Sequence, residues 1–213
     1  MSAFRKQRFL TPDLLAVTTL VLTGVVISWP ILWGGYLTYV DNAAHLTEIY
    51  SLAFDAHNGW SDAAFCGYPL GNLHSPLWYG LLAVLVRVGL PAGALYASCL
   101  LGAFMAPACA LYYVARRHLA PWLALGVAYA LLIQRPSFVG LGSALGGMWT
   151  HYLAAAALIL LIERLTRPTS DAPGVLWIAA LVGLIGMTHF FTYVALVIVG
   201  VFHVARCLLR VRS

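Results

Sequence analysis

The sequence predicts an all-α fold, a polytopic integral membrane bundle of helices, and three observations support this prediction. Of the 213 residues, 62% are hydrophobic and only 9% are charged, whereas soluble domains carry roughly 25% charged residues. The hydrophobic residues form runs long enough to enter a bilayer. Lys and Arg stand singly or in pairs at the ends of these runs, where topology-setting charges lie. The net charge of +5 is thus spread along the chain. We therefore expect membrane lipids as partners and no nucleic acid, whose binding needs a basic stripe.

The first apolar run, at about 14–37, predicts an uncleaved first span. It follows a short amino-terminal segment, 1–13, that contains Arg5, Lys6 and Arg8. Positive charge favours the cytoplasmic side of a membrane, so this segment is predicted to lie in the cytoplasm. We expect an integral protein of a prokaryotic cytoplasmic (inner) membrane.

The segment 40–75 is predicted to be a loop on the outer, non-cytoplasmic side. It contains no Lys or Arg and is easily translocated, and its acidic residues are Asp41, Glu48, Asp55 and Asp62. The loop opens with a helical pattern in which Leu46, Tyr50 and Phe54 recur near helical spacing. This pattern predicts an interfacial helix lying along the membrane surface.

Later apolar runs extend the bundle to roughly seven or eight crossings, in one membrane domain that covers 1–213. These runs lie at about 76–90, 92–114, 122–133, 152–162, 175–187 and 190–209. Simple alternation of the spans places Arg87 in the cytoplasm and leaves Arg116 and Arg117 outside, against the positive-inside rule. Either a half-span is hidden between Pro76 and Val114, or the arginine pair is an exception.

Asp41, His45 and Glu48 are the first candidate site residues, because their spacing puts them on one face of a helix. Two carboxylates and an imidazole offer general-base chemistry, and they are the candidate ligands if a divalent metal ion takes part. The alternative is structural. Asp41 stands where a helix N-cap is expected, and His45 and Glu48 would form the wet face of the interfacial helix.

Three further histidines, His74, His151 and His189, are predicted near the outer ends of spans. Together with His45 and Glu48 they are candidate substrate-binding residues, since polar groups at such depth often mark sites. Each one alone is equally compatible with an interfacial histidine that is bonded to the backbone. The Gly-rich segment 140–147 lacks the ending of a phosphate-binding loop and favours close helix packing.

Several segments together resemble a known family. They are YVDNAAHLTEIYSLAFDAHNGW, GYPLGNLHSPLWYGLLAVL, ARRHLAPWLALGVAYALL, HYLAAAALILLIERLTR and GMTHFF. In this order, after a basic amino-terminus and one span, they resemble the N-terminal membrane module of the GT-C glycosyltransferase superfamily. The nearest varieties are the YfhO-like and dolichyl-phosphate-mannose mannosyltransferase-like membrane proteins.

The resemblance implies a function at the outer face. In that superfamily an acidic residue of the first outer loop is the usual catalytic base or metal-associated residue, and Asp41 takes its place here. The implied donor is a polyprenyl-phosphate sugar, and the acceptor is a lipid, a glycan or a protein. The implied reaction is an inverting transfer in which the carboxylate deprotonates the acceptor hydroxyl.

Two departures from the family pattern keep other interpretations open. Many relatives carry a second acidic residue after the Gly-bearing outer turn, whereas positions 147–151 here read GMWTH. Typical members also continue with further spans. The chain is therefore either an enzyme module, including half of a split enzyme, or a non-catalytic integral subunit of a larger membrane protein complex. Both versions imply another membrane protein chain as a partner.

Overall fold

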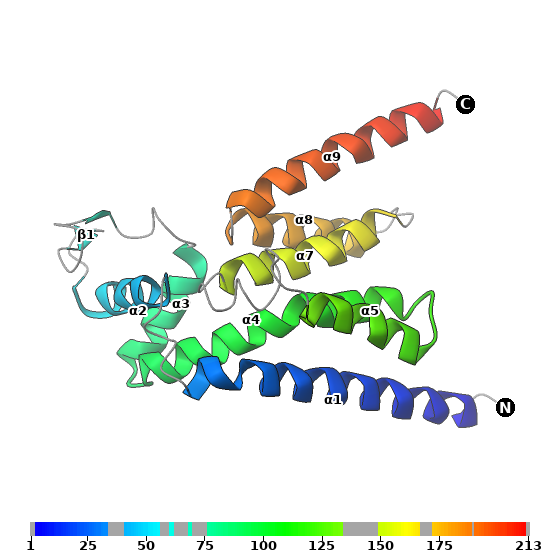
Figure 1. Ribbon diagram of the computed structural model, residues 1–213. Helices are drawn as coiled ribbons and strands as arrows, with labels where there is room; N and C mark the ends of the chain where they lie inside the picture. The colour runs from blue at the N-terminus through cyan, green and yellow to red at the C-terminus, as the bar shows by residue number, and fades with distance from the viewer. Residues whose placement is uncertain are drawn as a thin grey trace.

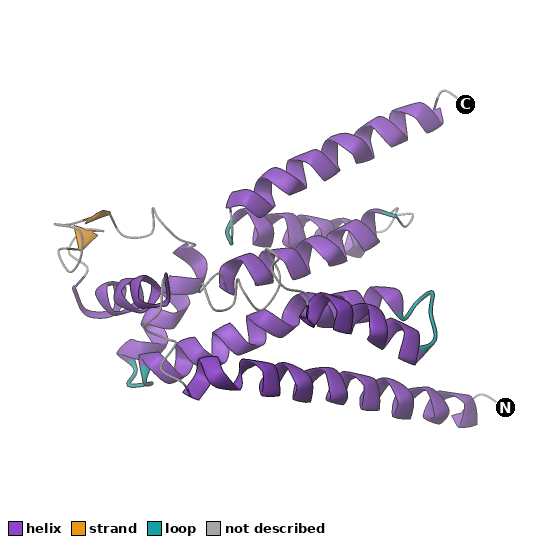
Figure 2. Ribbon diagram, in the orientation of Figure 1, coloured by secondary structure: helices purple, strands orange, loops and turns teal. Residues whose placement is uncertain are grey.

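The computed structural model describes residues 3–33, 41–55, 60–61, 68–69, 76–133, 149–166, 172–188 and 190–211 (Figure 1). Its helices are α1 (Ala3–Trp33), α2 (Asp41–Tyr50), the π-helical turn η2 (Ser51–Asp55), α3 (Pro76–Arg87), α4 (Ala92–Ala115), α5 (Pro121–Ile133), α7 (Trp149–Leu165), α8 (Ala172–Gly186) and α9 (Phe190–Val211). Two short strands, β1 (Trp60–Ser61) and β2 (Tyr68–Pro69), pair in antiparallel fashion. The all-α class is confirmed, and Figure 2 shows helix in nearly every described segment.

The helices α1, α4, α7, α8 and α9 run lengthwise between the two ends of the molecule, and the shorter α5 lies beside α1 and α4 toward the basic end (Figure 1). One end, here called the basic end, contains the chain terminus before α1, the α4–α5 turn and the carboxyl end of α7. Its described basic residues include Arg116, Arg117 and Arg164. The opposite end, here called the α2 end, contains α2, α3 and the β1–β2 pair.

The core forms where α4 meets its neighbours, because α4 packs against α1, α5 and α7. Side chains such as Leu20, Leu100 and Leu132 are at most 2% exposed there. A second, smaller cluster joins α7, α8 and α9 through Leu161, Ile185 and other apolar residues. By contrast, α8 and α9 leave much of their apolar surface uncovered. Their exposed large side chains are Val175, Leu176, Trp177, Val182, Val194, Val197, Ile198, Val201, Phe202 and Val204.

Two of the described helices are long and apolar enough to cross a membrane, at Pro12–Trp29 and Ala92–Ala115. The remaining apolar helices are shorter: Leu77–Arg87, Pro121–Ile133, Gly174–Gly186 and Val194–Val204. A full crossing needs about 20 apolar residues in a helix. The described residues therefore confirm the helical bundle, while the predicted seven or eight crossings are not confirmed.

The position of α3 bears on the two alternatives left open for the spans around Arg87. Helix α3 has only 12 residues, and it lies at the α2 end without extending toward the basic end (Figure 1). The Arg87 Nε donates a hydrogen bond of 2.6 Å to the carbonyl oxygen of Ala53, so Arg87 lies beside the continuation of α2. Helix α4 then runs back, and it brings Arg116 and Arg117 to the same end as the basic amino-terminal segment.

The basic end is held together by charged pairs between helices. Asp13 of α1 accepts a hydrogen bond of 2.7 Å from the Tyr112 hydroxyl and one of 2.6 Å from Arg116 Nε. The hydrogen bond to Asp13 raises the pKa of the Arg116 guanidinium above its ordinary value, so this side chain stays charged. A second pair joins Arg117, just after α4, to Glu163 of α7.

Candidate functional site

The candidate site is built on the buried face of α2. His45 is 4% exposed and Glu48 is 1% exposed, and both lie on the same face as Ile49 at 1%. The π-helical turn η2 continues this face with Ser51 at 0%. Residues three and four apart in a helix share a face, so the predicted grouping of His45 with Glu48 is confirmed. Since buried polar groups must be hydrogen-bonded, this face needs polar partners from other helices.

Tyr79 of α3 is the partner of His45. Its hydroxyl lies 2.6 Å from His45 Nδ1, and the two rings lie 5.6 Å apart between centroids. Tyr79 itself is 0% exposed, and a buried tyrosine hydroxyl ordinarily has a hydrogen-bond partner. The bond fixes the orientation of the imidazole and leaves Nε2 as its second hydrogen-bonding atom.

An aromatic cluster surrounds this pair, with Trp149 at its centre. The Trp149 ring meets Trp78, Tyr79 and Tyr96 edge-on, at centroid distances of 6.3, 5.6 and 6.2 Å. Tyr96 also lies 6.0 Å from His45. Edge-to-face contacts of this kind are favourable for aromatic rings. They join α3, α4 and the first residue of α7 around the imidazole.

The carboxyl end of α8 is tied to the same cluster. Trp78 Nε1 donates a hydrogen bond of 3.2 Å to the Thr188 hydroxyl. That hydroxyl in turn donates to the carbonyl oxygen of Leu184, one turn earlier. Thr188 is 3% exposed. Helices α3 and α4, the start of α7 and the turn after α8 therefore meet at the α2 end. The buried face of α2 packs against α3 and α4.

The predicted site residues have different outcomes. Asp41 is the first residue of α2, in the predicted N-terminal position, and its side chain lies outside the described residues. His74 and His189 also lie outside the described residues. His151 lies in α7 soon after Trp149, and its ring centroid is 6.4 Å from that of Tyr152. Its predicted role in binding substrate stays a prediction.

The alternative in which His45 and Glu48 form a wet face is wrong. The exposed face of α2 and η2 is instead aromatic, since Tyr50 is 49% exposed and Phe54 is 58% exposed. Their rings lie 6.1 Å apart and form a pair on the outside. The residues of the predicted interfacial pattern therefore lie on two different faces. Tyr50 and Phe54 point outward, whereas Leu46 packs against the core.

Sequence reasoning missed Tyr79, Tyr96 and Trp149. All three lie in or beside apolar runs, where aromatic residues read as packing or interfacial residues. One signal was available. A histidine and a glutamate on a buried helix face require hydrogen-bonding partners, and the buried tyrosines of neighbouring spans are the residues that can supply them.

The described side chains do not form a metal centre. Among them, no group of three or more His, Cys, Asp or Glu could hold a metal ion. His45 Nδ1 is already engaged by Tyr79. The Asp41, His45 and Glu48 ligand set suggested by the sequence includes the Asp41 side chain, which lies outside the described residues, so it stays a prediction.

Comparison with known protein families, with curated proteins and with solved structures found no match to this chain.

Proposed function

We propose that the chain is a GT-C-like membrane glycosyltransferase module that uses a polyprenyl-phosphate sugar at the α2 end. The observation that carries the proposal is the position of Asp41 and His45 in α2. The helix begins at Asp41, and one turn later His45 is buried and bonded to Tyr79. A first outer helix with its acidic residue at the start is also the arrangement that the family resemblance implies.

The distribution of charge supports a membrane orientation with the basic end in the cytoplasm. Arg116, Arg117 and Arg164 share that end with the basic amino-terminal segment. Helix α2, at the other end, belongs to the segment 40–75, whose sequence has four acidic residues and no Lys or Arg. Positive residues favour the cytoplasmic side, so the α2 end faces outward. Among the described residues the α2 end carries Arg87, which is engaged with Ala53.

Cysteine labelling tests this orientation across a single helix, α4. Val88, just before α4, is 72% exposed, and Leu119, just after it, is 38% exposed. Each is replaced by cysteine in a chain whose native cysteines, Cys66, Cys99, Cys109 and Cys207, are changed to alanine. In intact cells, an impermeant maleimide should label Val88→Cys, whereas Leu119→Cys should react only after permeabilisation. Labelling of both from one side, or the reverse pattern, would overturn the orientation.

The chemistry assigned to Asp41 is that of a general base. The acceptor hydroxyl oxygen attacks the anomeric carbon of the donor sugar, and its proton passes to the Asp41 carboxylate. The bond between that carbon and the phosphate oxygen breaks, and polyprenyl phosphate leaves with the electron pair. The amino-terminus of α2 carries a partial positive charge, which stabilises the carboxylate before the reaction.

Asp41→Asn tests the catalytic role. The purified chain in lipid vesicles is given polyprenyl-phosphate mannose or glucose together with membrane extract as the source of acceptor. Loss of a general base should lower sugar transfer by about 10²–10⁴-fold, with unchanged thermal unfolding. Asp62→Asn is the matched control, an acid of the same loop outside the Asp41–His45–Glu48 face. Undiminished transfer by Asp41→Asn, or no transfer by the wild-type chain, would reject the enzyme.

A second candidate function is a non-catalytic subunit of a membrane complex. The specific observation in its favour is the exposed apolar surface of α8 and α9, where Trp177 is 64% exposed and Phe202 is 72% exposed. Contiguous apolar surface of this kind faces lipid or another chain. Co-purification with one membrane protein in a fixed ratio, together with absent transfer activity, would favour the subunit.

A further inference from the structure

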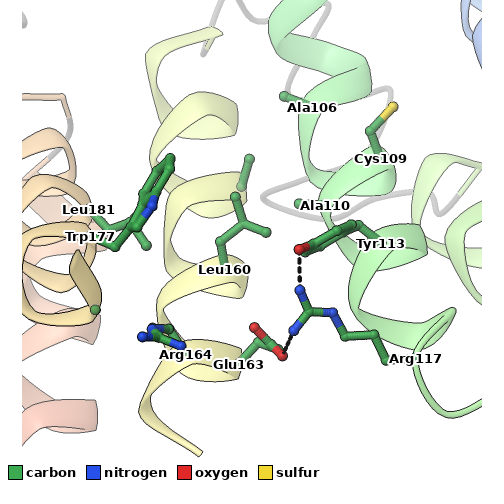
Figure 3. A pocket seen from close by; sticks show the side chains of 12 residues that line it. Ala106, Cys109, Ala110, Tyr113, Arg117, Leu160, Glu163, Arg164, Trp177 and Leu181 are labelled. Carbon is green, nitrogen blue, oxygen red and sulfur yellow. Dashed lines mark hydrogen bonds and ion pairs between the residues drawn. The ribbon is translucent and has the colours of Figure 1, made fainter. Parts of the chain in front are cut away.

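A pocket lies between α4, α7 and α8, toward the basic end and away from the α2 site (Figure 3). Its volume is about 760 Å³, which is within the range of roughly 300–1,000 Å³ for sites that hold small molecules. Its lining includes Ala106, Ala110, Arg117, Leu160, Glu163 and Trp177.

Most of the pocket wall is apolar. Ala106 and Ala110 of α4 and Ala156 of α7 have small side chains and leave space between the helices. Leu160 of α7 lies across from the α4 alanines, and Trp177 of α8 lies farther along the lining (Figure 3). Along α4 the lining extends from Ala106 to just past the end of the helix, a length of about 16 Å at the helical rise per residue. This shape fits an extended hydrocarbon chain.

The end of the pocket that lies at the basic end is charged. Arg117 donates hydrogen bonds to Glu163 and to the Tyr113 hydroxyl, and its guanidinium carbon lies 4.3 Å from the centroid of the Tyr113 ring. These three contacts hold the guanidinium in place (Figure 3). Arg164 follows Glu163 in α7 and also lines the pocket. Among the described lining residues there are two arginines and one glutamate, so the described lining carries a net charge of one positive unit.

We propose that this pocket binds an anionic phospholipid of the surrounding membrane. One acyl chain lies along the alanine-lined wall, and the phosphate of the headgroup meets Arg117 and Arg164. Basic pockets between membrane helices on the cytoplasmic side are suited to such headgroups, and guanidinium groups bind phosphate through charge-assisted hydrogen bonds. The proposal rests on the membrane orientation proposed above and is independent of sugar transfer.

Charge and shape together favour a lipid over the other occupants. A transmembrane helix of another chain would use the small side chains, but its apolar surface would offer no polar group to the charged end of the pocket. A free phosphate ion would meet the arginines but would leave the apolar wall empty. An anionic lipid satisfies both parts of the pocket.

Native mass spectrometry of the full chain, released from nanodiscs of mixed phosphatidylglycerol and phosphatidylcholine, tests the proposal. The wild-type chain should retain phosphatidylglycerol in preference to phosphatidylcholine. The double variant R117Q/R164Q should retain it about tenfold less, which corresponds to the loss of one charge-assisted interaction. R87Q, which removes one positive charge at the α2 end, is the control and should retain the lipid as the wild-type chain does.

Two more variants separate binding from a merely structural role of the pocket. E163Q removes the one carboxylate among the described lining residues and should strengthen phosphatidylglycerol retention, whereas a structural ion pair alone predicts no gain. A106F fills the apolar wall and should weaken retention without changing the pocket's charges. Thermal unfolding of each variant in detergent checks that it remains folded.

Three outcomes would overturn the proposal. Equal retention by the wild-type chain and R117Q/R164Q would mean that the lipid is adventitious. Displacement of the lipid by inorganic phosphate alone would mean that the pocket recognises the free ion. A co-purifying membrane protein that excludes the lipid would mean that the pocket is a helix-docking site. Loss of sugar transfer plays no part in these outcomes, so failure here and failure of the proposed enzyme are distinguishable.

Discussion

The two ends of the molecule handle polar groups among apolar helices in different ways. At the basic end, carboxylates are paired with arginines across helices, as in Asp13 with Arg116 and Glu163 with Arg117. These side chains remain partly exposed, with Arg116 at 23% and Asp13 at 32%. At the α2 end, a histidine and a glutamate are almost wholly buried, and the bond to the histidine comes from a tyrosine.

The difference separates a structural arrangement from one that is suited to chemistry. An arginine–carboxylate pair stays ionised and joins two helices, and it has little scope to exchange protons near neutral pH. An imidazole is a group that can accept or donate a proton. Its hydrogen bond to the tyrosine hydroxyl holds it in a fixed orientation. The α2 end is therefore the more suitable place for the proposed reaction, whereas the basic end is suited to binding a charged headgroup.

The largest loss of stability should follow from changing Trp149, the centre of the aromatic cluster at the α2 end. Trp149→Ala should lower the free energy of unfolding by about 3–5 kcal/mol, because it leaves a cavity among Trp78, Tyr79 and Tyr96. Trp149→Phe should cost clearly less, since the indole Nε1 has no hydrogen-bond partner among the described residues. Denaturant unfolding in mild detergent measures both. Equal losses would mean that ring packing is not what stabilises this end.

Tyr79→Phe should cause the second-largest loss of stability. It removes only the hydroxyl and leaves the buried His45 Nδ1 without this partner, which should cost about 1–3 kcal/mol in unfolding free energy. Tyr50→Phe is the matched control, because Tyr50 is 49% exposed, and it should stay within about 0.5 kcal/mol of the wild-type chain. Indistinguishable unfolding curves for the two variants would refute the importance of the His45–Tyr79 bond.

A smaller effect is expected at the α3–α4 turn, which connects the α2 end to the long helix α4. Gly89 has a φ of 98°, and nothing lies within 4 Å of the position that a Cβ would take. Gly89→Ala should therefore cost about 1–2 kcal/mol through backbone strain alone. Gly93 has the same open space inside α4, so Gly93→Ala should be neutral or stabilise by up to about 1 kcal/mol. Thermal unfolding compares the pair, and a shift of the same sign for both would contradict the role of φ.

The smallest effect should come from the half-exposed pair at the basic end. A double-mutant cycle with Asp13→Asn and Arg116→Gln should give a coupling energy of about 0.2–1 kcal/mol. The coupling should fall as salt is raised, because partly exposed charges are screened. A much larger coupling that does not respond to salt would make the basic end resemble the buried α2 end and would remove the contrast.

Local sequence patterns were sufficient for most of the helices. The apolar run predicted at about 92–114 corresponds to Ala92–Ala115, and the run at about 122–133 corresponds to Pro121–Ile133. Helical spacing also put His45 and Glu48 on one face, as observed. These features depend on residues that are close in sequence, so apolar composition and a period of 3.6 residues are enough to predict them.

The direction in which that face points could not be predicted locally. The α2 segment has apolar residues on both sides, with Ile49 on the buried face and Tyr50 on the exposed one. The choice between them depends on Tyr79, Tyr96 and Trp149, which come from three other helices. The hydrogen bond from Tyr79 makes burial of the imidazole favourable.

The sequence by itself thus determined that this chain is helical and apolar, where its charges stand, and which polar residues share a turn of helix. The tertiary structure decided that α3 stays at the α2 end, so Arg116 and Arg117 return to the basic end. It also decided that His45 is bonded to Tyr79 in the interior. The physical reason is that helix formation and hydrophobicity are local properties, whereas burial and hydrogen-bond partnership depend on which distant helices pack together.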